Sequence, residues 1–115
     1  MTRILVIDSD PDSGRFVQLT LELEGFDVEV ACNGEDALDK ARAHTPSVIV
    51  LDMMMPVMDG WAFCARQRGD AVLAEIPVVI LSAAPMERLT NLGAAAVLQK
   101  PFEYQGLISA VRANC

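Results

Sequence analysis

Four polar residues each stand at the end of a short apolar run in this chain. Asp8 follows residues 4–7, Asp52 follows 48–51, Ser82 follows 78–81 and Lys100 follows 94–99. Two carboxylates suit a divalent cation such as Mg²⁺. A hydroxyl and an ammonium group suit the oxygens of a phosphoryl group. An aspartate can also act as a nucleophile and form an aspartyl phosphate, so the residue types indicate phosphoryl chemistry if they share one site.

The apolar runs predict where these residues meet. Short, continuous apolar runs bounded by turn residues are typical of strands buried on both faces of a parallel sheet. We predict strands over residues 3–8, 26–31, 47–52, 76–82 and 95–99. They alternate with helical patterns, which indicates an α/β fold with a doubly wound parallel five-stranded sheet. Ligands of such sheets bind beyond the carboxyl ends of the strands, where all four polar residues fall.

The helix signals are equally regular. Asp10 is predicted to cap the first helix, which starts at Pro11, stops at Gly25 and carries Phe16, Leu19 and Leu23 on one apolar face. Asn33 is predicted to cap a second helix that ends before Thr45-Pro46, and Asp59 to cap a third. Residues 83–93 leave room for a helix of only about two turns. A last helix is predicted over residues 103–114, with Leu107, Ile108 and Val111 on its buried face.

Length and composition narrow the class of protein. The 115 residues suit a single domain, residues 1–115, without an output domain. No apolar stretch approaches the roughly 20 residues of a membrane helix, and no signal peptide pattern opens the chain. The net charge of -7 argues against direct binding of nucleic acid. The three cysteines match no metal spacing and are expected to be reduced thiols in a cytoplasmic protein.

Each candidate residue also has a structural interpretation. Asp52 could simply end a strand, Ser82 could satisfy nearby backbone groups, and Lys100 could be a solvated surface lysine. Asp8 and Asp52 together would repel each other unless a cation or a proton intervened. Each signal is weak alone, and their order and common location make the set specific.

Several segments together resemble the receiver domain of bacterial two-component response regulators. The matching segments are residues 4–8, 50–60, 80–83 and 100–102, and the resemblance extends over the whole chain. It implies a (βα)5 fold with the flavodoxin-like strand order 2-1-3-4-5. It also implies that Asp52 accepts a phosphoryl group from a phosphohistidine on a histidine kinase or a histidine phosphotransfer protein. Such a domain assists its own phosphorylation without being a turnover enzyme.

The same resemblance implies the roles of the surrounding residues. Asp8, Asp52 and the main-chain carbonyl of Met54 would hold Mg²⁺. Ser82, Lys100 and the backbone amide of Ala83 would contact the phosphoryl group.

Three departures from the family pattern affect this interpretation. Ser9 stands where the family has a second metal-binding acid, so we predict weaker Mg²⁺ binding. Val97 stands where the family often has an aromatic switch residue. The segment between Ser82 and Lys100 is shorter than usual by about one helical turn. We therefore expect an altered surface for a downstream protein partner, formed by this segment, the fifth strand and the last helix.

Two other functions remain open at this point. A degenerate receiver could bind a protein partner without being phosphorylated, as Ser9, Val97 and the short segment would favour. A haloacid-dehalogenase-like phosphatase could use Asp8 as nucleophile and Asp10 as general acid. The chain is short for that family, and the phosphatase hypothesis leaves the segment around Asp52 unexplained. The identity of the phosphorylated aspartate distinguishes these hypotheses.

Overall fold

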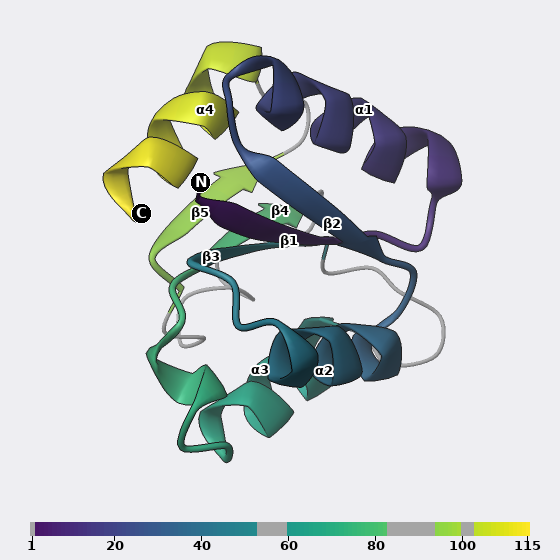
Figure 1. Ribbon diagram of the computed structural model, residues 1–115, viewed down its shortest axis with the longest axis vertical. Coiled ribbons are helices and arrows are strands. Elements are labelled where there is room, and N and C mark those ends of the chain that lie inside the picture. The colour runs from purple at the N-terminus through teal and green to yellow at the C-terminus, as the bar shows by residue number, and fades with distance from the viewer. Residues whose placement is uncertain (1, 53–59, 83–93, 100–102) are drawn as a thin grey trace.

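Five parallel strands form one sheet at the centre of the molecule (Figure 1). The computed structural model describes residues 2–52, 60–82, 94–99 and 103–115. The strands are β1 (Arg3–Ile7), β2 (Asp27–Ala31), β3 (Val48–Asp52), β4 (Val78–Ser82) and β5 (Ala96–Gln99). Their order is β2-β1-β3-β4-β5, with every neighbouring pair parallel. The predicted fold class and strand order are confirmed.

Helices cover both faces of this sheet. The helices are α1 (Pro11–Leu23), α2 (Gly34–Ala43), α3 (Gly60–Arg68) and α4 (Tyr104–Ala113), and a short 3₁₀ helix, η1 (Leu73–Glu75), precedes β4. Helices α1 and α4 lie over one face, whereas α2 and α3 lie over the other (Figure 1). The sequence did not predict η1. The predicted cap Asp59 and the short helix in residues 83–93 lie outside the described residues.

The predicted starts of the first two helices are confirmed. The Asp10 side chain accepts a hydrogen bond from the N–H of Asp12, and the Asn33 side chain accepts one from Asp36. Each bond satisfies a backbone donor that has no partner inside the helix. Helix α1 ends just before Gly25, whose φ of 94° lies in the left-handed region that glycine adopts readily.

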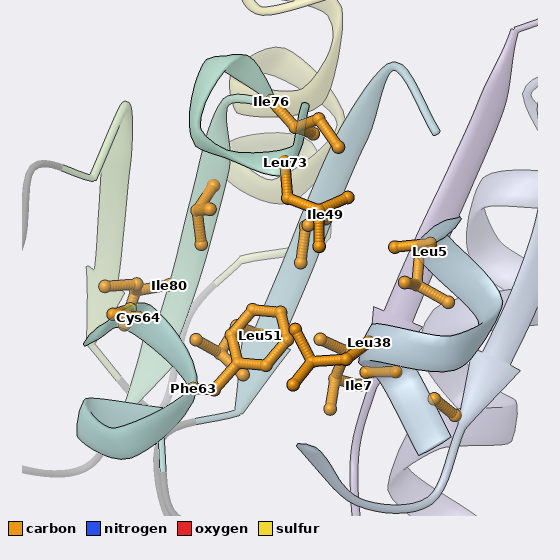
Figure 2. Close-up of a cluster of buried hydrophobic side chains, with 14 residues drawn as sticks. Leu5, Ile7, Leu38, Ile49, Leu51, Phe63, Cys64, Leu73, Ile76 and Ile80 are labelled. Atoms are coloured by element: carbon orange, nitrogen blue, oxygen red, sulfur yellow. The ribbon is translucent and has the colours of Figure 1, made fainter. Parts of the chain in front are cut away.

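The core consists of two apolar layers, one on each face of the sheet. Alternate residues of each strand point to opposite faces, so Leu5, Ile49 and Ile80 pack toward α2 and α3. Phe63 and Leu38 complete this layer from the helices (Figure 2). The other layer joins strand residues such as Val6 and Val50 to buried residues of α1 and α4. Because the central strands are buried on both faces, little freedom remains in where their carboxyl ends lie.

The apolar face predicted for α1 points away from the sheet, although the apolar face of such a helix normally packs against the core. Phe16, Leu19 and Leu23 are exposed. The buried face of the helix consists instead of Gly14, Val17, Thr20 and Leu21. Val17 and Leu21 pack against the strands. Gly14 has no side chain, so α1 approaches Asp8 and Val30 of the sheet closely at this position. The helix therefore has two apolar sides, of which only one belongs to the core.

A polar cap holds the segment between α3 and β4. The Asp70 carboxylate accepts hydrogen bonds from the N–H groups of Leu73 and Val72 and lies 3.3 Å from the Nε of Arg42. The two backbone hydrogen bonds, with help from Arg42, hold the pKa of Asp70 below its ordinary value. The folded state therefore favours the ionised form of this carboxyl.

The lowered pKa of Asp70 makes the free energy of unfolding depend on pH. The contribution of Asp70 is complete above the pKa of an unfolded aspartate, about 3.9. It is lost progressively as the pH falls below that value, and it is gone once the pH lies below the lower pKa of the folded state. We expect Asp70→Asn to flatten the acid side of a plot of urea midpoint against pH. An unchanged acid slope in this variant would show that Asp70 does not contribute.

Candidate functional site

Two buried carboxylates lie side by side at the carboxyl edge of the sheet. Asp8 directly follows β1, and Asp52 is the last residue of β3. Ile7 pairs with Leu51 in the register of these strands, so Asp8 and Asp52 come next on two strands about 4.8 Å apart. Their exposed fractions are only 4% and 7%. Both residues are therefore largely shielded from solvent at neighbouring strand ends.

Backbone contacts fix the position of Asp8. Its N–H donates to the carbonyl of Ala31 at 3.0 Å, which extends the pairing of β1 with β2. Its Oδ1 accepts the N–H of Asp10 at 2.9 Å. A Cβ placed on Gly14 would lie 3.4 Å from the Cβ of Asp8, so α1 passes close beside this carboxylate. Gly14 could have been identified from the sequence, because it is a glycine inside the helix that follows the candidate acid Asp8.

The second acid of this loop, Asp10, caps a helix. Asp10 uses its Oδ1 to accept the N–H of Asp12 at 3.1 Å and caps α1, as predicted. Ser9, half-buried between Asp8 and Asp10, adds no carboxylate. Among the residues that the structure describes, no group of three or more His, Cys, Asp or Glu side chains could hold a metal.

The donor set still fits Mg²⁺. This ion keeps several waters and binds through one or two carboxylates together with phosphate oxygens. Asp8 and Asp52 supply those two carboxylates from rigid strand ends, without a third acid from position 9. Close carboxylates in a buried place favour a bound cation because it offsets their mutual repulsion.

The hydroxyl candidate lies at the same edge. Ser82 ends β4 and is fully buried. Leu81 pairs with Asp52, and Ser82 pairs with Gln99 at the end of β5. Lys100 follows Gln99, the residue of β5 that pairs with Ser82, directly in the sequence. Lys100, Ala83 and Met54, the other predicted contacts, lie outside the described residues.

Val97 contributes to the core at the position of the expected aromatic switch. It pairs with Ile80 across the sheet and packs, partly buried, against the core layer under α2 and α3. A β-branched side chain has one strongly preferred rotamer in many settings and no large ring to move. This position therefore offers no rotating aromatic side chain.

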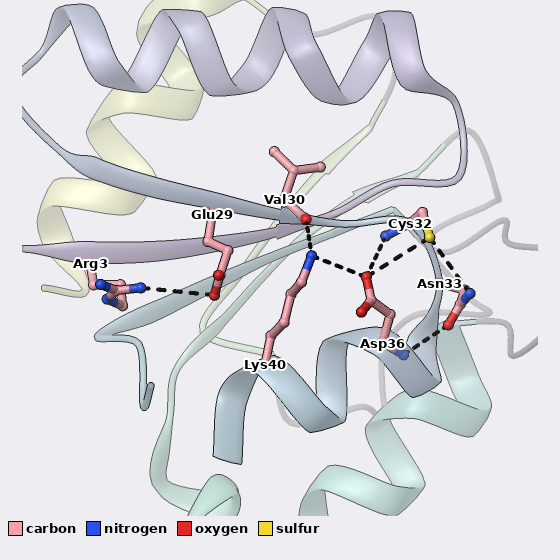
Figure 3. A network of polar contacts seen from close by, with 7 residues as sticks. All are labelled: Arg3, Glu29, Val30, Cys32, Asn33, Asp36 and Lys40. Atoms are coloured by element: carbon pink, nitrogen blue, oxygen red, sulfur yellow. Dashed lines mark hydrogen bonds and ion pairs between the residues drawn. The ribbon is translucent and has the colours of Figure 1, made fainter. Parts of the chain in front are cut away.

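A polar network covers the free edge of the sheet beside the acidic site (Figure 3). The Nζ of Lys40 donates to the outward carbonyl of Val30 at 2.8 Å and lies 3.2 Å from the Asp36 carboxylate. Asp36 also accepts the N–H of Cys32 at 3.4 Å. A hollow of about 400 Å³ opens between this network, α1 and Asp8. The network satisfies one carbonyl of β2 and the N–H of the residue that follows the strand, and it ties α2 to this edge of the sheet.

Comparison with family models matches residues 4–112 to the response regulator receiver domain. The chain belongs to this family. A relative among curated proteins is the DNA-binding dual master transcriptional regulator RpaA of Synechocystis sp. It is 38% identical over 117 aligned positions, which cover 98% of this chain and 48% of the relative. The response regulator ArlR of Staphylococcus saprophyticus is 32% identical, with coverage of 98% and 52%. This receiver domain thus spans about half the length of the curated relatives that it matches.

Solved structures agree with this assignment. The chemotaxis protein CheY4 of Vibrio cholerae is 29% identical, covers 100% of this chain and 99% of its own, and superposes with a TM-score of 0.90. The receiver domain of a signal transduction histidine kinase from Syntrophus aciditrophicus is also 29% identical, with coverage of 98% and 89% and a TM-score of 0.92. In the described part of this receiver domain, no helix combines the length and apolar character needed to cross a membrane.

Proposed function

We propose that this receiver domain accepts a phosphoryl group on Asp52. The observation that carries the proposal is the pair of buried carboxylates, Asp8 and Asp52, at adjacent strand ends, with Ser82 at the same edge. A rigid strand end holds the Asp52 carboxylate in place, which reduces the entropy lost on reaching the transition state. Asp52 is the acceptor because it ends the central strand, between Asp8 on one side and Ser82 on the other.

The transfer step follows from these positions. An Asp52 oxygen attacks phosphorus, the new O–P bond forms, and the P–N bond to the donor imidazole breaks with the electron pair leaving on nitrogen. Asp8 and Asp52 would hold Mg²⁺, which would supply positive charge to offset that of the phosphoryl group. The Ser82 hydroxyl and the Ala83 amide donate hydrogen bonds to the transferred group, and the Lys100 ammonium offsets its charge.

The proposed partners follow from the family. A histidine kinase or histidine phosphotransfer protein supplies the phosphohistidine. The downstream protein partner contacts a surface that includes β5 and α4; residues 83–93, the third predicted part of this surface, lie outside the described residues. We propose residues 1–115 as a single receiver unit, which acts as a signalling module rather than as a turnover enzyme.

Intact mass measurement after incubation with Mg²⁺ and a small phosphodonor tests the proposal. We expect the wild type to gain one phosphoryl group and Asp52→Asn to gain none, because an amide is not a nucleophile in this chemistry. Asp8→Asn is the matched variant, and it keeps Asp52 while removing a metal ligand. We expect it to gain the group more slowly, with less dependence on Mg²⁺.

The same experiment separates the other hypotheses. A gain that persists in Asp52→Asn and disappears in Asp8→Asn would support a phosphatase-like nucleophile at Asp8. No gain in the wild type at any Mg²⁺ concentration would support a binding module that works without phosphorylation. Either result would contradict Asp52 as the acceptor.

A further inference from the structure

The hollow beside the edge strand β2 has the size of a small-molecule site. Its volume is about 400 Å³, and residues of α1, β2 and α2 line it. Helix α1 lies on one face of the sheet and α2 on the other, so the hollow is bounded by two helices that flank β2 (Figure 1). Small-molecule sites in proteins typically measure about 300–1,000 Å³. The hollow therefore has room for one small ligand.

The charges around the hollow balance each other. Two acids, Asp8 and Asp36, and two bases, Arg15 and Lys40, are among its lining residues. Ser9, which also lines the hollow, is uncharged. An acid at position 9 would add a negative charge and disfavour an anion. The serine therefore keeps the hollow open to a negatively charged ligand.

Three of these four charged groups already have partners. The Oδ1 of Asp8 accepts a backbone N–H at 2.9 Å. The Nζ of Lys40 lies 3.2 Å from the Asp36 carboxylate and donates to the carbonyl of Val30 at 2.8 Å (Figure 3). Arg15 is exposed and forms no ion pair with any residue in the ranges that the structure describes. The hollow thus offers a guanidinium group, which binds a carboxylate through two parallel N–H···O bonds.

The remaining lining suits an apolar body attached to such a carboxylate. Pro11 and Val30 supply apolar surface, and the Gln18 amide and the Ser9 hydroxyl are neutral hydrogen-bond donors. Ligand sites typically combine apolar surface with a few polar groups that fix the orientation of the ligand. Inorganic phosphate would use the guanidinium group but has no apolar part to contact Val30. The lining therefore favours an organic acid over a simple inorganic anion.

We propose that the hollow binds a small organic carboxylate, with its charged group on Arg15 and its apolar body against Pro11 and Val30. This is a ligand site outside the phosphoacceptor, although Asp8 forms one part of its wall. The proposal requires neither Mg²⁺ nor phosphorylation of Asp52. Its failure would leave the proposed function unaffected.

NMR titration of the isotope-labelled protein with benzoate tests the proposal, in the absence of Mg²⁺ and phosphodonor. We expect saturable shifts of the backbone amide signals of Gln18, Val30 and Cys32, which line the hollow, and none for Leu73 before β4. Benzamide is the matched neutral probe, because it keeps the ring and lacks the charge. We expect it and inorganic phosphate each to bind at least about tenfold more weakly than benzoate.

Substitutions locate the carboxylate. Arg15→Gln keeps a polar side chain of good helix propensity and is expected to weaken benzoate binding at least about tenfold. Ser9→Asp is also expected to weaken it, because the added charge repels the anion. Arg66→Gln is the matched control, since Arg66 is another exposed arginine that does not line the hollow, and it is expected to leave the dissociation constant unchanged. Circular dichroism on each variant checks that the fold is retained.

Four outcomes would overturn the proposal. The first is an absence of saturable shifts around the hollow. The second is equal binding of benzoate and benzamide, which would show that no charged group is recognised. The third is equal binding of benzoate and inorganic phosphate, which would show that the apolar lining takes no part. The fourth is a Gln variant at Arg15 that binds benzoate as tightly as the wild type.

Discussion

Replacing Ser9 by aspartate is expected to tighten Mg²⁺ binding by at least about tenfold. The new carboxylate would stand beside Asp8, where the present site offers carboxylates from Asp8 and Asp52 but none from position 9. A charge about 4 Å from the ion is worth several kcal/mol in a partly shielded site, and part of this is lost to repulsion among the acids before the ion binds. A net gain of about 1.4 kcal/mol is a tenfold change.

The repulsion among the three carboxylates can also be tested independently, through the stability of the fold. Without Mg²⁺, three adjacent carboxylates should make Ser9→Asp less stable than the wild type. With saturating Mg²⁺ the order should reverse, because the ion binds the folded state more tightly. Calorimetric titration gives the affinity, and urea denaturation with and without Mg²⁺ gives the two stabilities.

Ser47→Asp is the matched control for this experiment. It adds the same charge at an exposed position directly before β3, at the amino edge of the sheet and away from the strand ends that carry Asp8 and Asp52. We expect little change in Mg²⁺ affinity from it. Equal affinities in the wild type and Ser9→Asp would contradict the view that position 9 limits the metal site.

Gln67→Leu is expected to destabilise the fold by about 3 kcal/mol. The Gln67 side chain is 5% exposed, and its Nε2 donates to the carbonyls of Leu73 and Ile76 at 2.7 and 3.1 Å. Leucine would leave both carbonyls without this donor in the interior, and each unsatisfied group costs about 1–3 kcal/mol. Urea unfolding monitored by circular dichroism measures the loss.

Two further variants separate hydrogen bonding from packing. Gln67→Glu keeps the size of the side chain and, when ionised, replaces the two donors by acceptors. We expect it to be at least as damaging as leucine at neutral pH and less so at acid pH, where a protonated carboxyl can donate. Arg66→Ala, an exposed change on the same helix, should stay within about 0.5 kcal/mol. A leucine variant as stable as the wild type would show that the amide does not hold this segment.

Local chemistry determined much of this fold. The strands are continuous apolar runs, and the first two helices start where an Asp or Asn side chain can accept a backbone N–H. These signals act over a few residues, so they predicted the five strands and the acidic edge, whereas the order of the strands in the sheet was predicted from the family resemblance. Placing Asp52 and Ser82 at that edge needed only the rule that parallel strands end together.

Only the tertiary structure decided which side of α1 faces the sheet. Phe16, Leu19 and Leu23 form the larger apolar side, yet Val17 and Leu21 enter the core, because Gly14 lets the helix approach Asp8 closely. The carbonyls that Gln67 binds come from a segment six to nine residues further along the chain. No local pattern predicts such contacts. They depend on how the helices and strands pack, because the free energy gained by burying apolar side chains comes from contacts between elements and not from a single helix.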